Sequence, residues 1–156
     1  MPGYGTLDAE RGSGLLPWSW AREHLQRSHD YWVATLRPEG RAHMMPVWGV
    51  WMEEALWFSS SRGSRKTRNL LANAHCSIAT DNAYEPVVIE GEAVLVDDLA
   101  AIDAFRAEVN QKYKTDYSID FFNPTDNACF KVAPAWAFGL MESDFTGSPT
   151  RWVFDR

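Results

Sequence analysis

The chain has 156 residues, enough for one domain with a single buried core. Hydrophobic residues make up 46% and charged residues 23%, which excludes a disordered or fibrous chain. With no run of about 18 apolar residues and no signal pattern, we expect a cytoplasmic protein that does not enter a membrane. The net charge of −6 argues against a surface that coats nucleic acid.

The cysteines and histidines indicate neither a disulfide framework nor a metal site. Cys76 and Cys129 do not form a CxxC pair, which favours a reducing compartment. The four histidines lack the spacing of zinc ligands, so we expect no bound metal. They are His24, His29, His43 and His75.

The first predicted elements are an arm, a helix and a hairpin. We expect residues 1–16 to form an N-terminal arm and residues 17–156 a single cofactor-binding domain. Apolar spacing from Pro17 to about Gln26 predicts a short helix. Aromatic and β-branched residues over Tyr31–Leu36 predict a strand, which a turn joins to a return strand over His43–Trp51.

Two residues of the return strand suggest special geometry. Pro46 cannot donate to a strand ladder, so we expect a bulge or a sheet edge there. Gly49 would let another group approach the backbone closely. Because both faces of this strand are largely apolar, we expect both to be covered.

The remaining pattern completes the fold prediction. A strand over Leu56–Ser60 leads to a helix capped by Ser64, and two further strands lead to a helix capped by Asp98. The expected buried residues are Thr67, Leu70, Leu71 and Ala74 in the first helix, and Leu99, Ile102, Phe105 and Val109 in the second. The two intervening strands are Cys76–Thr80 and Val87–Val96, and three short ones follow near Ala128–Val132, Ala135–Met141 and Arg151–Phe154. Seven strands joined mostly by tight turns predict a mainly β fold, an antiparallel barrel with two or three helices.

One segment concentrates positive charge. No acidic residue lies between Glu54 and Asp81, whereas Arg62, Arg65, Lys66 and Arg68 fall within seven positions. Without those four cations the net charge falls from −6 to −10. Cations in the first turn of a helix are unfavourable unless an anion binds there. The segment therefore predicts a phosphate site; the alternative is a solvated basic face offset by acids from elsewhere in the fold.

Five segments together resemble the pyridoxamine 5′-phosphate oxidase-like split β-barrel superfamily, and more narrowly its flavin/deazaflavin oxidoreductase B branch. They are Arg41–Trp51, Leu56–Ser59, Ser64–Leu70, Val88–Ala93 and Thr150–Phe154. The resemblance implies a split barrel that forms a homodimer with cofactor sites at the subunit interface. The acidic net charge and the lack of a long apolar run lead us to expect no nucleic-acid and no membrane partner.

The resemblance also implies the site residues. The serine-rich strand end and basic helix start would hold a cofactor phosphate, the return strand would lie along the tricyclic ring, and a C-terminal pair would approach the ring from the partner subunit. The phosphate residues are Ser59, Ser60, Arg62, Ser64, Arg65, Lys66 and Asn69; the ring residues are Met45, Pro46, Val47 and Trp48; the C-terminal pair is Arg151 and Trp152.

The expected activity is hydride transfer between coenzyme F420 and a small organic substrate. FMN is the alternative cofactor, because the same phosphate site would accept it, while the surplus of cations would suit the acidic tail of F420. No catalytic side chain is assigned; His43 or Tyr31 could supply a proton, although packing roles suit both better. A non-catalytic cofactor- or haem-binding barrel is a further alternative, and a single-strand nucleic-acid barrel is disfavoured by the acidic remainder of the chain.

Overall fold

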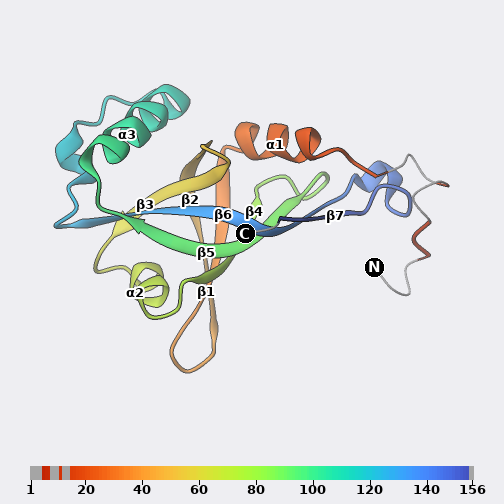
Figure 1. The fold of residues 1–156 in the computed structure, drawn as a ribbon, viewed down its shortest axis with the longest axis horizontal. Coiled ribbons are helices and arrows are strands. Elements are labelled where there is room, and N and C mark those ends of the chain that lie inside the picture. Colours follow the sequence, from red (N-terminus) through yellow and green to blue (C-terminus); the bar gives the residue numbers. More distant parts are fainter. Residues whose placement is uncertain (1–4, 8–10, 12–14, 155–156) are drawn as a thin grey trace.

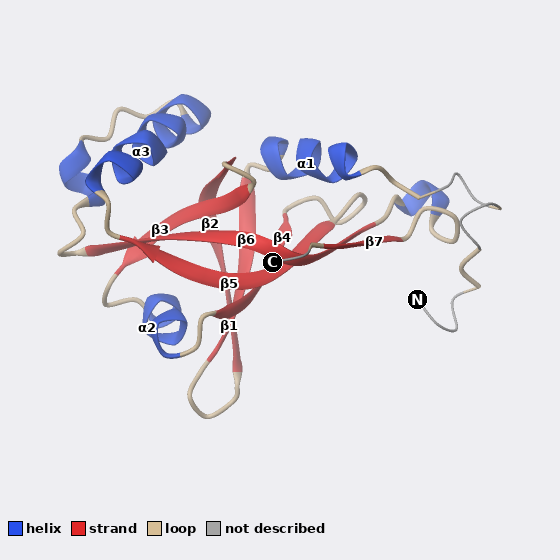
Figure 2. Cartoon of the chain, viewed as in Figure 1, coloured by secondary structure: helices blue, strands red, loops and turns tan. Residues whose placement is uncertain are grey.

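The computed structural model describes residues 5–7, 11 and 15–154, which form seven strands, three α-helices and two short 3₁₀ helices (Figure 2). Most of the predicted arm, and residues 155–156, lie outside the described residues. The helices are α1 (Trp18–Arg27), α2 (Arg65–Ala72) and α3 (Leu99–Tyr113), with 3₁₀ helices η1 (Ile119–Phe122) and η2 (Glu142–Asp144). The strands are β1 (Asp30–Leu36), β2 (Ala42–Met52), β3 (Ala55–Ser61), β4 (His75–Thr80), β5 (Val87–Val96), β6 (Asn127–Gly139) and β7 (Thr150–Val153).

The strands form a closed antiparallel barrel, which confirms the predicted fold class. Their order is β3-β2-β1-β4-β5-β6-β7, and an additional pairing of β3 with β6 closes six of them into a ring. Strand β7 continues the sheet beyond β6. Figure 1 shows α1 and α3 along the upper side of the barrel and α2 below it, near the β1–β2 hairpin. Within the described ranges, no helix is long and apolar enough to cross a bilayer.

Strand β2 is shared between two unequal pairings, and this splits the barrel wall. Its Ala42–Trp48 part pairs with β1, whereas β3 pairs only with Gly49–Met52. On the N-terminal side of Gly49, β2 and β3 diverge, because β3 continues along β6 through Ser59–Ser61. Pro46 lies in the part of β2 that has no strand partner on the β3 side, so the predicted sheet edge is confirmed there.

The core has two parts. The first fills the barrel interior with residues such as Tyr31, Leu56 and Phe58, while the second lies under α3 and contains Trp57 and Phe105. Together they bury the inward-facing side chains of the strands and the apolar stripe of α3.

Gly49 confirms the predicted close approach to its backbone. A Cβ atom added there would lie 2.9 Å from the carbonyl oxygen of Trp57 and 3.2 Å from the ring of Tyr31. No other residue type fits between these two groups without a shift.

The predicted caps of α2 and α3 are confirmed, but some of the residues predicted to be buried in these helices are exposed. Ser64 accepts a hydrogen bond from the Thr67 amide, and Asp98 accepts one from the Ala101 amide, as capping requires. Leu71 and Leu99 are 53% and 61% exposed, so the prediction that they are buried is wrong. A helix that rests on a curved barrel contacts it over a narrow stripe, and residues at its edges remain outside.

Two strand predictions are also corrected. Three short C-terminal strands were expected, but the structure has two, because β6 runs unbroken through Pro134. A register shift opposite Glu90 and Gly91 absorbs the proline, and it leaves Ala135 without a partner in the ladder with β5. The expectation that both faces of β2 are covered is wrong for one chain, since Met44 is 57% exposed and Trp48 41% exposed.

The exposed residues of β2 belong to a broad apolar face on the outside of the barrel, which we term the outer face. In an antiparallel sheet, residues directly opposite one another point to the same side. Two rows of such partners cross six strands. The first is Pro46, Trp32, Ala79, Val88, Phe138 and Arg151; the second is Met44, Ala34, Ser77, Glu90, Trp136 and Val153.

Candidate functional site

A pocket of about 310 Å³ lies where β2 and β3 diverge. Its walls come from β2, the end of β3, the start of α2, and the segment that contains α3 and η1. The lining residues are Pro46, Val47, Trp48, Ser59, Ser60, Ser61, Lys66, Phe105, Val109, Tyr117, Phe121, Phe122 and Asn127. Six of the thirteen predicted cofactor-binding residues are among them.

One end of the pocket carries a hydroxyl–ammonium cluster made of Ser60, Ser64 and Lys66. The Lys66 ammonium donates to the Ser60 hydroxyl at 2.9 Å, and this hydroxyl lies 2.9 Å from that of Ser64. Ser64 is also the N-cap of α2. The cluster thus forms where the chain leaves β3 and begins a helix, a position at which free backbone N–H groups favour an anion.

No carboxylate of the described residues balances the charge of Lys66. No carboxylate among the described residues lies within ion-pair distance of Lys66, Arg65 or Arg68. Burial lowers the pKa of Lys66, because desolvation disfavours the charged ammonium. A basic face offset by acids therefore describes Arg62, which pairs with Asp97 at 3.5 Å, and in part Arg65, which lowers the pKa of Glu39.

Two of the predicted phosphate residues face away from the pocket. Arg62 donates through Nε to the carbonyl of Pro124 and through its amide to that of Asp126, so it holds the loop between η1 and β6. Asn69 is buried and donates through Nδ2 to the Thr35 hydroxyl at 2.9 Å. The side chains of Arg62 and Asn69 therefore hold neighbouring segments of the protein together and do not line the pocket.

Arg65 diverges from Lys66 and lies toward the β1–β2 hairpin. Burial lowers the pKa of His43, and the nearby cations Arg37, Lys66 and Arg65 lower it further. The Arg37 Nε and His43 Nδ1 atoms are buried and have no partner among the described residues. Arg37 and Arg65 thus lie beside the hydroxyl–ammonium cluster on the hairpin side of Lys66, together with Glu39, whose pKa both cations lower.

The β2 edge supplies backbone groups to the pocket. In an antiparallel strand, the N–H and C=O groups of alternate residues point to the same neighbour. The groups of Gly49 point toward the β1 side, where Tyr113 and Lys112 bind them. The C=O group of Pro46 and both backbone groups of Trp48 consequently point into the gap between β2 and β3. Met45 is exposed but does not line the pocket.

The wall opposite β2 is aromatic, and the sequence analysis did not identify it. This aromatic wall consists of Phe105, Tyr117, Phe121 and Phe122. Tyr117 and Phe121 stack with centroids 4.2 Å apart and planes 11° apart. Three of the four lie in the 114–127 segment, whose conformation no local pattern predicts; the only signal was its density of aromatic residues.

The C-terminal pair does not reach the pocket of its own chain. Arg151 lies on the outer face, with its guanidinium 5.6 Å from the ring centroid of Trp136. Trp152 points to the opposite side of β7, where its ring centroid lies 5.6 Å from that of Trp18. The pair therefore separates, and Arg151 alone is available on the outer face.

Neither of the two candidate proton donors lines the pocket. The Tyr31 hydroxyl is buried, donates to the carbonyl of Leu25 and accepts from Lys112. Its pKa is raised, chiefly by burial. His43 lies on the hairpin side with Arg37. Tyr117 is the lining residue that carries a phenol.

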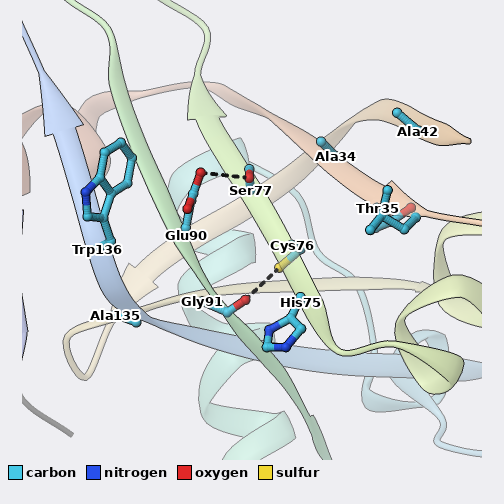
Figure 3. Close-up of a pocket in the computed structure, with 11 residues that line it drawn as sticks. Ala34, Thr35, Ala42, His75, Cys76, Ser77, Glu90, Gly91, Ala135 and Trp136 are labelled. Carbon is cyan, nitrogen blue, oxygen red and sulfur yellow. Dashed lines mark hydrogen bonds between the residues drawn. The ribbon is translucent and has the colours of Figure 1, made fainter. Parts of the chain in front are cut away.

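A second, larger pocket of about 510 Å³ lies on the outer face. Figure 3 shows Trp136 and Ala135 on one side of it and Ala34 and Ala42 on the other. The two hydrogen bonds drawn in Figure 3 join Ser77 to Glu90 at 3.4 Å and the Cys76 thiol to the Gly91 carbonyl at 3.8 Å. This pocket is a hollow within an apolar sheet face, and it lacks the cations of the first.

Known proteins share this fold and sequence pattern. The model of the pyridoxamine 5′-phosphate oxidase family matches residues 20–140. A solved F420 reductase is 25% identical, with 74% of this chain and 94% of that chain covered and a TM-score of 0.62. A putative 5-nitroimidazole antibiotic resistance protein from Bacteroides thetaiotaomicron is 15% identical, with coverages of 79% and 82% and a TM-score of 0.69.

A conserved hypothetical protein from Mycobacterium tuberculosis also has this fold, at 16% identity, coverages of 88% and 85%, and a TM-score of 0.71. No curated protein matches the sequence. The family match spans more than half of the chain and includes α2 and all six barrel strands. The chain belongs to the pyridoxamine 5′-phosphate oxidase family and has the split β-barrel of its superfamily.

Proposed function

We propose that the protein is an oxidoreductase that transfers a hydride between coenzyme F420 and a small organic substrate, with FMN as the alternative cofactor. One observation carries the proposal. A single pocket joins an ammonium without a carboxylate partner to an open strand edge and an aromatic wall. A phosphorylated aromatic ring has groups complementary to all three.

The cluster of Ser60, Ser64 and Lys66 fits a phosphate. Two hydroxyls and one ammonium can donate to phosphate oxygens, and charge-assisted hydrogen bonds are about twice as strong as neutral ones. An anion would also balance the half-buried charge of Lys66, which no described carboxylate does. The residues present therefore fit the group that the family match suggests.

The strand edge and aromatic wall fit a planar ring. The backbone groups of Pro46 and Trp48 would bind its polar edge, while Phe105 and Phe121 would exclude water from it. When bound in its reduced form, either cofactor supplies the hydride, and the protein's part is to bind, orient and shield the reactants.

The cations on the hairpin side of Lys66 favour F420 over FMN. Arg37 and Arg65 lie beyond the hydroxyl–ammonium cluster and would bind a further acidic group in exchange for part of their interaction with Glu39. F420 has an acidic tail after its phosphate, whereas FMN ends at the phosphate. The 25% identical F420 reductase is consistent with this ranking.

We extend the proposal to a homodimer that forms through the outer face. Pro46 and Trp48 belong both to the pocket and to this face, so a second chain seated there would border the pocket. The exposed side chains of Trp32, Met44 and Val153 would be buried. Arg151 would then be able to approach the partner's pocket. An interface of this kind also explains why both sides of β2 are apolar in the sequence.

The haem-binding alternative lacks a histidine ligand in this pocket. None of its lining residues is a histidine, and the histidine that lines the outer-face pocket, His75, lies 3.7 Å from Glu92. Histidine is a common axial ligand of haem iron.

Titration of the apoprotein with pure F420 and, separately, with pure FMN tests the proposal. We expect both to bind, with the smaller dissociation constant for F420, and the loaded protein to oxidise reduced F420 when quinones or enones are supplied. Binding of FMN far tighter than F420 would reverse the ranking. Absence of binding for both would refute the function.

A further inference from the structure

The two facing walls of the pocket are joined at one end by side chains of α3. Wall residues Phe105 and Val109 lie on α3, and the last two residues of this helix, Lys112 and Tyr113, contact β2. We term Lys112 and Tyr113 the latch. The latch contacts Gly49, which follows directly after the pocket residue Trp48.

The latch completes a ladder that β1 leaves unfinished. Strand β1 begins at Asp30, opposite Trp48, so the backbone groups of Gly49 that point toward β1 have no strand partner. The Tyr113 hydroxyl accepts from the Gly49 amide at 2.8 Å and donates to the carbonyl of His29 at 2.6 Å. The Lys112 ammonium donates to the Gly49 carbonyl at 2.8 Å. Both orphan groups of Gly49 are thereby satisfied by α3.

The latch also holds the Trp48 side chain. The rings of Tyr113 and Trp48 stack with centroids 4.2 Å apart and planes 3° apart. Tyr113 does not itself line the pocket, whereas Trp48 does. Tyr113 therefore backs an indole that the pocket uses as part of its wall.

The interior end of the latch is anchored in the core. The Lys112 ammonium donates to the Tyr31 hydroxyl at 2.9 Å, and Tyr31 is fully buried. Tyr31 in turn donates to the carbonyl of Leu25, the last buried residue of α1. A continuous chain of hydrogen bonds thus holds α3 in place relative to the barrel core and α1.

We propose that Lys112 and Tyr113 are positioning residues that set the separation of the two pocket walls and the orientation of Trp48, and thereby the affinity for the planar ring. The inference rests on the proposed function. It assigns roles to two residues outside the pocket, which no motif in the sequence marks.

Conservative variants separate the two contributions. Tyr113→Phe keeps the ring that stacks on Trp48 and removes the hydroxyl that accepts from Gly49. Lys112→Met removes the donor to the Gly49 carbonyl, and Lys112→Arg restores a cationic donor. Tyr84→Phe and Lys114→Met are the matched controls, because Tyr84 is 71% exposed and Lys114 is exposed beyond the end of α3.

The experiment combines amide hydrogen exchange at Gly49 without ligand, the dissociation constants of F420 and FMN, and thermal unfolding. Loss of the hydrogen bond from the Gly49 amide to the Tyr113 hydroxyl in Tyr113→Phe should speed exchange at Gly49 by about 2- to 10-fold and weaken ring binding by a similar factor. Lys112→Met should weaken binding likewise, and Lys112→Arg should recover most of the affinity. The controls should match the wild type.

Three results would overturn the inference. The first is unchanged exchange at Gly49 in Tyr113→Phe. The second is faster exchange with unchanged cofactor affinity, which would leave the latch as a structural contact alone. The third is a wild-type protein that binds neither cofactor, and this result differs from the others because it removes the proposed function as well. Should Lys112→Met fail to fold, Tyr113→Phe still decides the outcome.

Discussion

The Lys66 ammonium and the Ser60 hydroxyl are 2.9 Å apart at the point where the first helix after β3 begins. This contact links the basic helix start to the serine-rich strand end, which lie six residues apart in the sequence. Because burial lowers the pKa of Lys66 and no described carboxylate pairs with it, the contact is electrostatically incomplete. A phosphate placed against both groups would complete it.

Reversing this charge should abolish tight cofactor binding without unfolding the protein. In Lys66→Glu a phosphate partner becomes a repulsive carboxylate, so we expect the dissociation constant to rise about 100-fold. Arg68→Glu, an exposed change on the same helix, is the matched control and should change it little. The measurement is a titration, with circular dichroism to compare the folds. Equal affinities in the two variants would contradict a phosphate at Lys66.

Removing the cap of α2 should reduce stability. Ser64 accepts from the Thr67 amide at 3.2 Å, and loss of an N-cap typically costs about 1 kcal/mol. We therefore expect Ser64→Ala to lower the free energy of unfolding in urea by about this amount. Ser118→Ala provides the control, because Ser118 precedes η1 but its side chain makes no capping hydrogen bond. A Ser64→Ala protein as stable as this control would show that the cap contributes nothing.

A methyl group at Gly49 should strain the barrel. The added Cβ would meet the Trp57 carbonyl oxygen at 2.9 Å, and overpacking of this kind costs about 1–3 kcal/mol. Gly63→Ala should leave stability nearly unchanged, since the nearest atom to its added Cβ would be the Ser61 hydroxyl oxygen at 3.7 Å. Chemical unfolding of both variants checks the difference. A smaller loss in Gly49→Ala than in Gly63→Ala would contradict the close packing at β2.

The sequence predicted the strands and caps, and it marked the residues of the hydroxyl–ammonium cluster, because each has a local cause. Aromatic and β-branched residues define β1, the Ser64 and Asp98 caps define helix starts, and the cations around Lys66 interrupt an acidic chain. These signals depend on neighbours within a few residues. The structure therefore brought Ser60, Ser64 and Lys66 together as expected.

Features that depend on distant segments were not predictable in the same way. The aromatic wall comes from a loop with no periodic pattern, and Arg62 binds that loop because it happens to lie beside Pro124. The latch joins Gly49 to Tyr113 across 64 positions. The proline at position 134 predicts a strand break, but β6 stays continuous because its register with β5 shifts there.

Lys112 should make stability depend on pH in alkaline solution. Burial lowers its pKa from 10.5 to about 8, although Asp81 and Asp30 act in the opposite direction. Between these two pH values the unfolded state binds more protons than the folded state. The contribution of Lys112 to the free energy of unfolding therefore increases as the pH rises from 8 to 10.5.

The tyrosines and thiols titrate in the opposite sense, so the Lys112 contribution must be isolated. Burial raises the pKa of Tyr113, Cys76 and Cys129 to about 12, and the stability they provide is lost as pH rises toward that value. The difference in unfolding free energy between the wild type and Lys112→Met cancels these groups. It should shift in favour of the wild type from pH 8 to pH 10. A difference that stays constant would show that Lys112 is solvated in the folded protein.

The proposed homodimer predicts a specific loss of assembly. Met44→Lys places a charge on the outer face and should convert a dimer into a monomer, with weaker cofactor binding as a consequence. Leu71→Lys is the control, because Leu71 is equally exposed but lies on α2. Sedimentation velocity measures the assembly state. A wild-type monomer at micromolar concentration, or a Met44→Lys dimer, would contradict the interface.

The most direct test of the central claim is a crystal structure of the protein grown with F420. The account predicts that the cofactor phosphate lies within about 3 Å of the Lys66 ammonium and the Ser60 and Ser64 hydroxyls, with the ring along Pro46 and Trp48. A cofactor bound elsewhere, with the Lys66–Ser60 contact still closed and the pocket between β2 and the aromatic wall empty at saturating ligand, would contradict it.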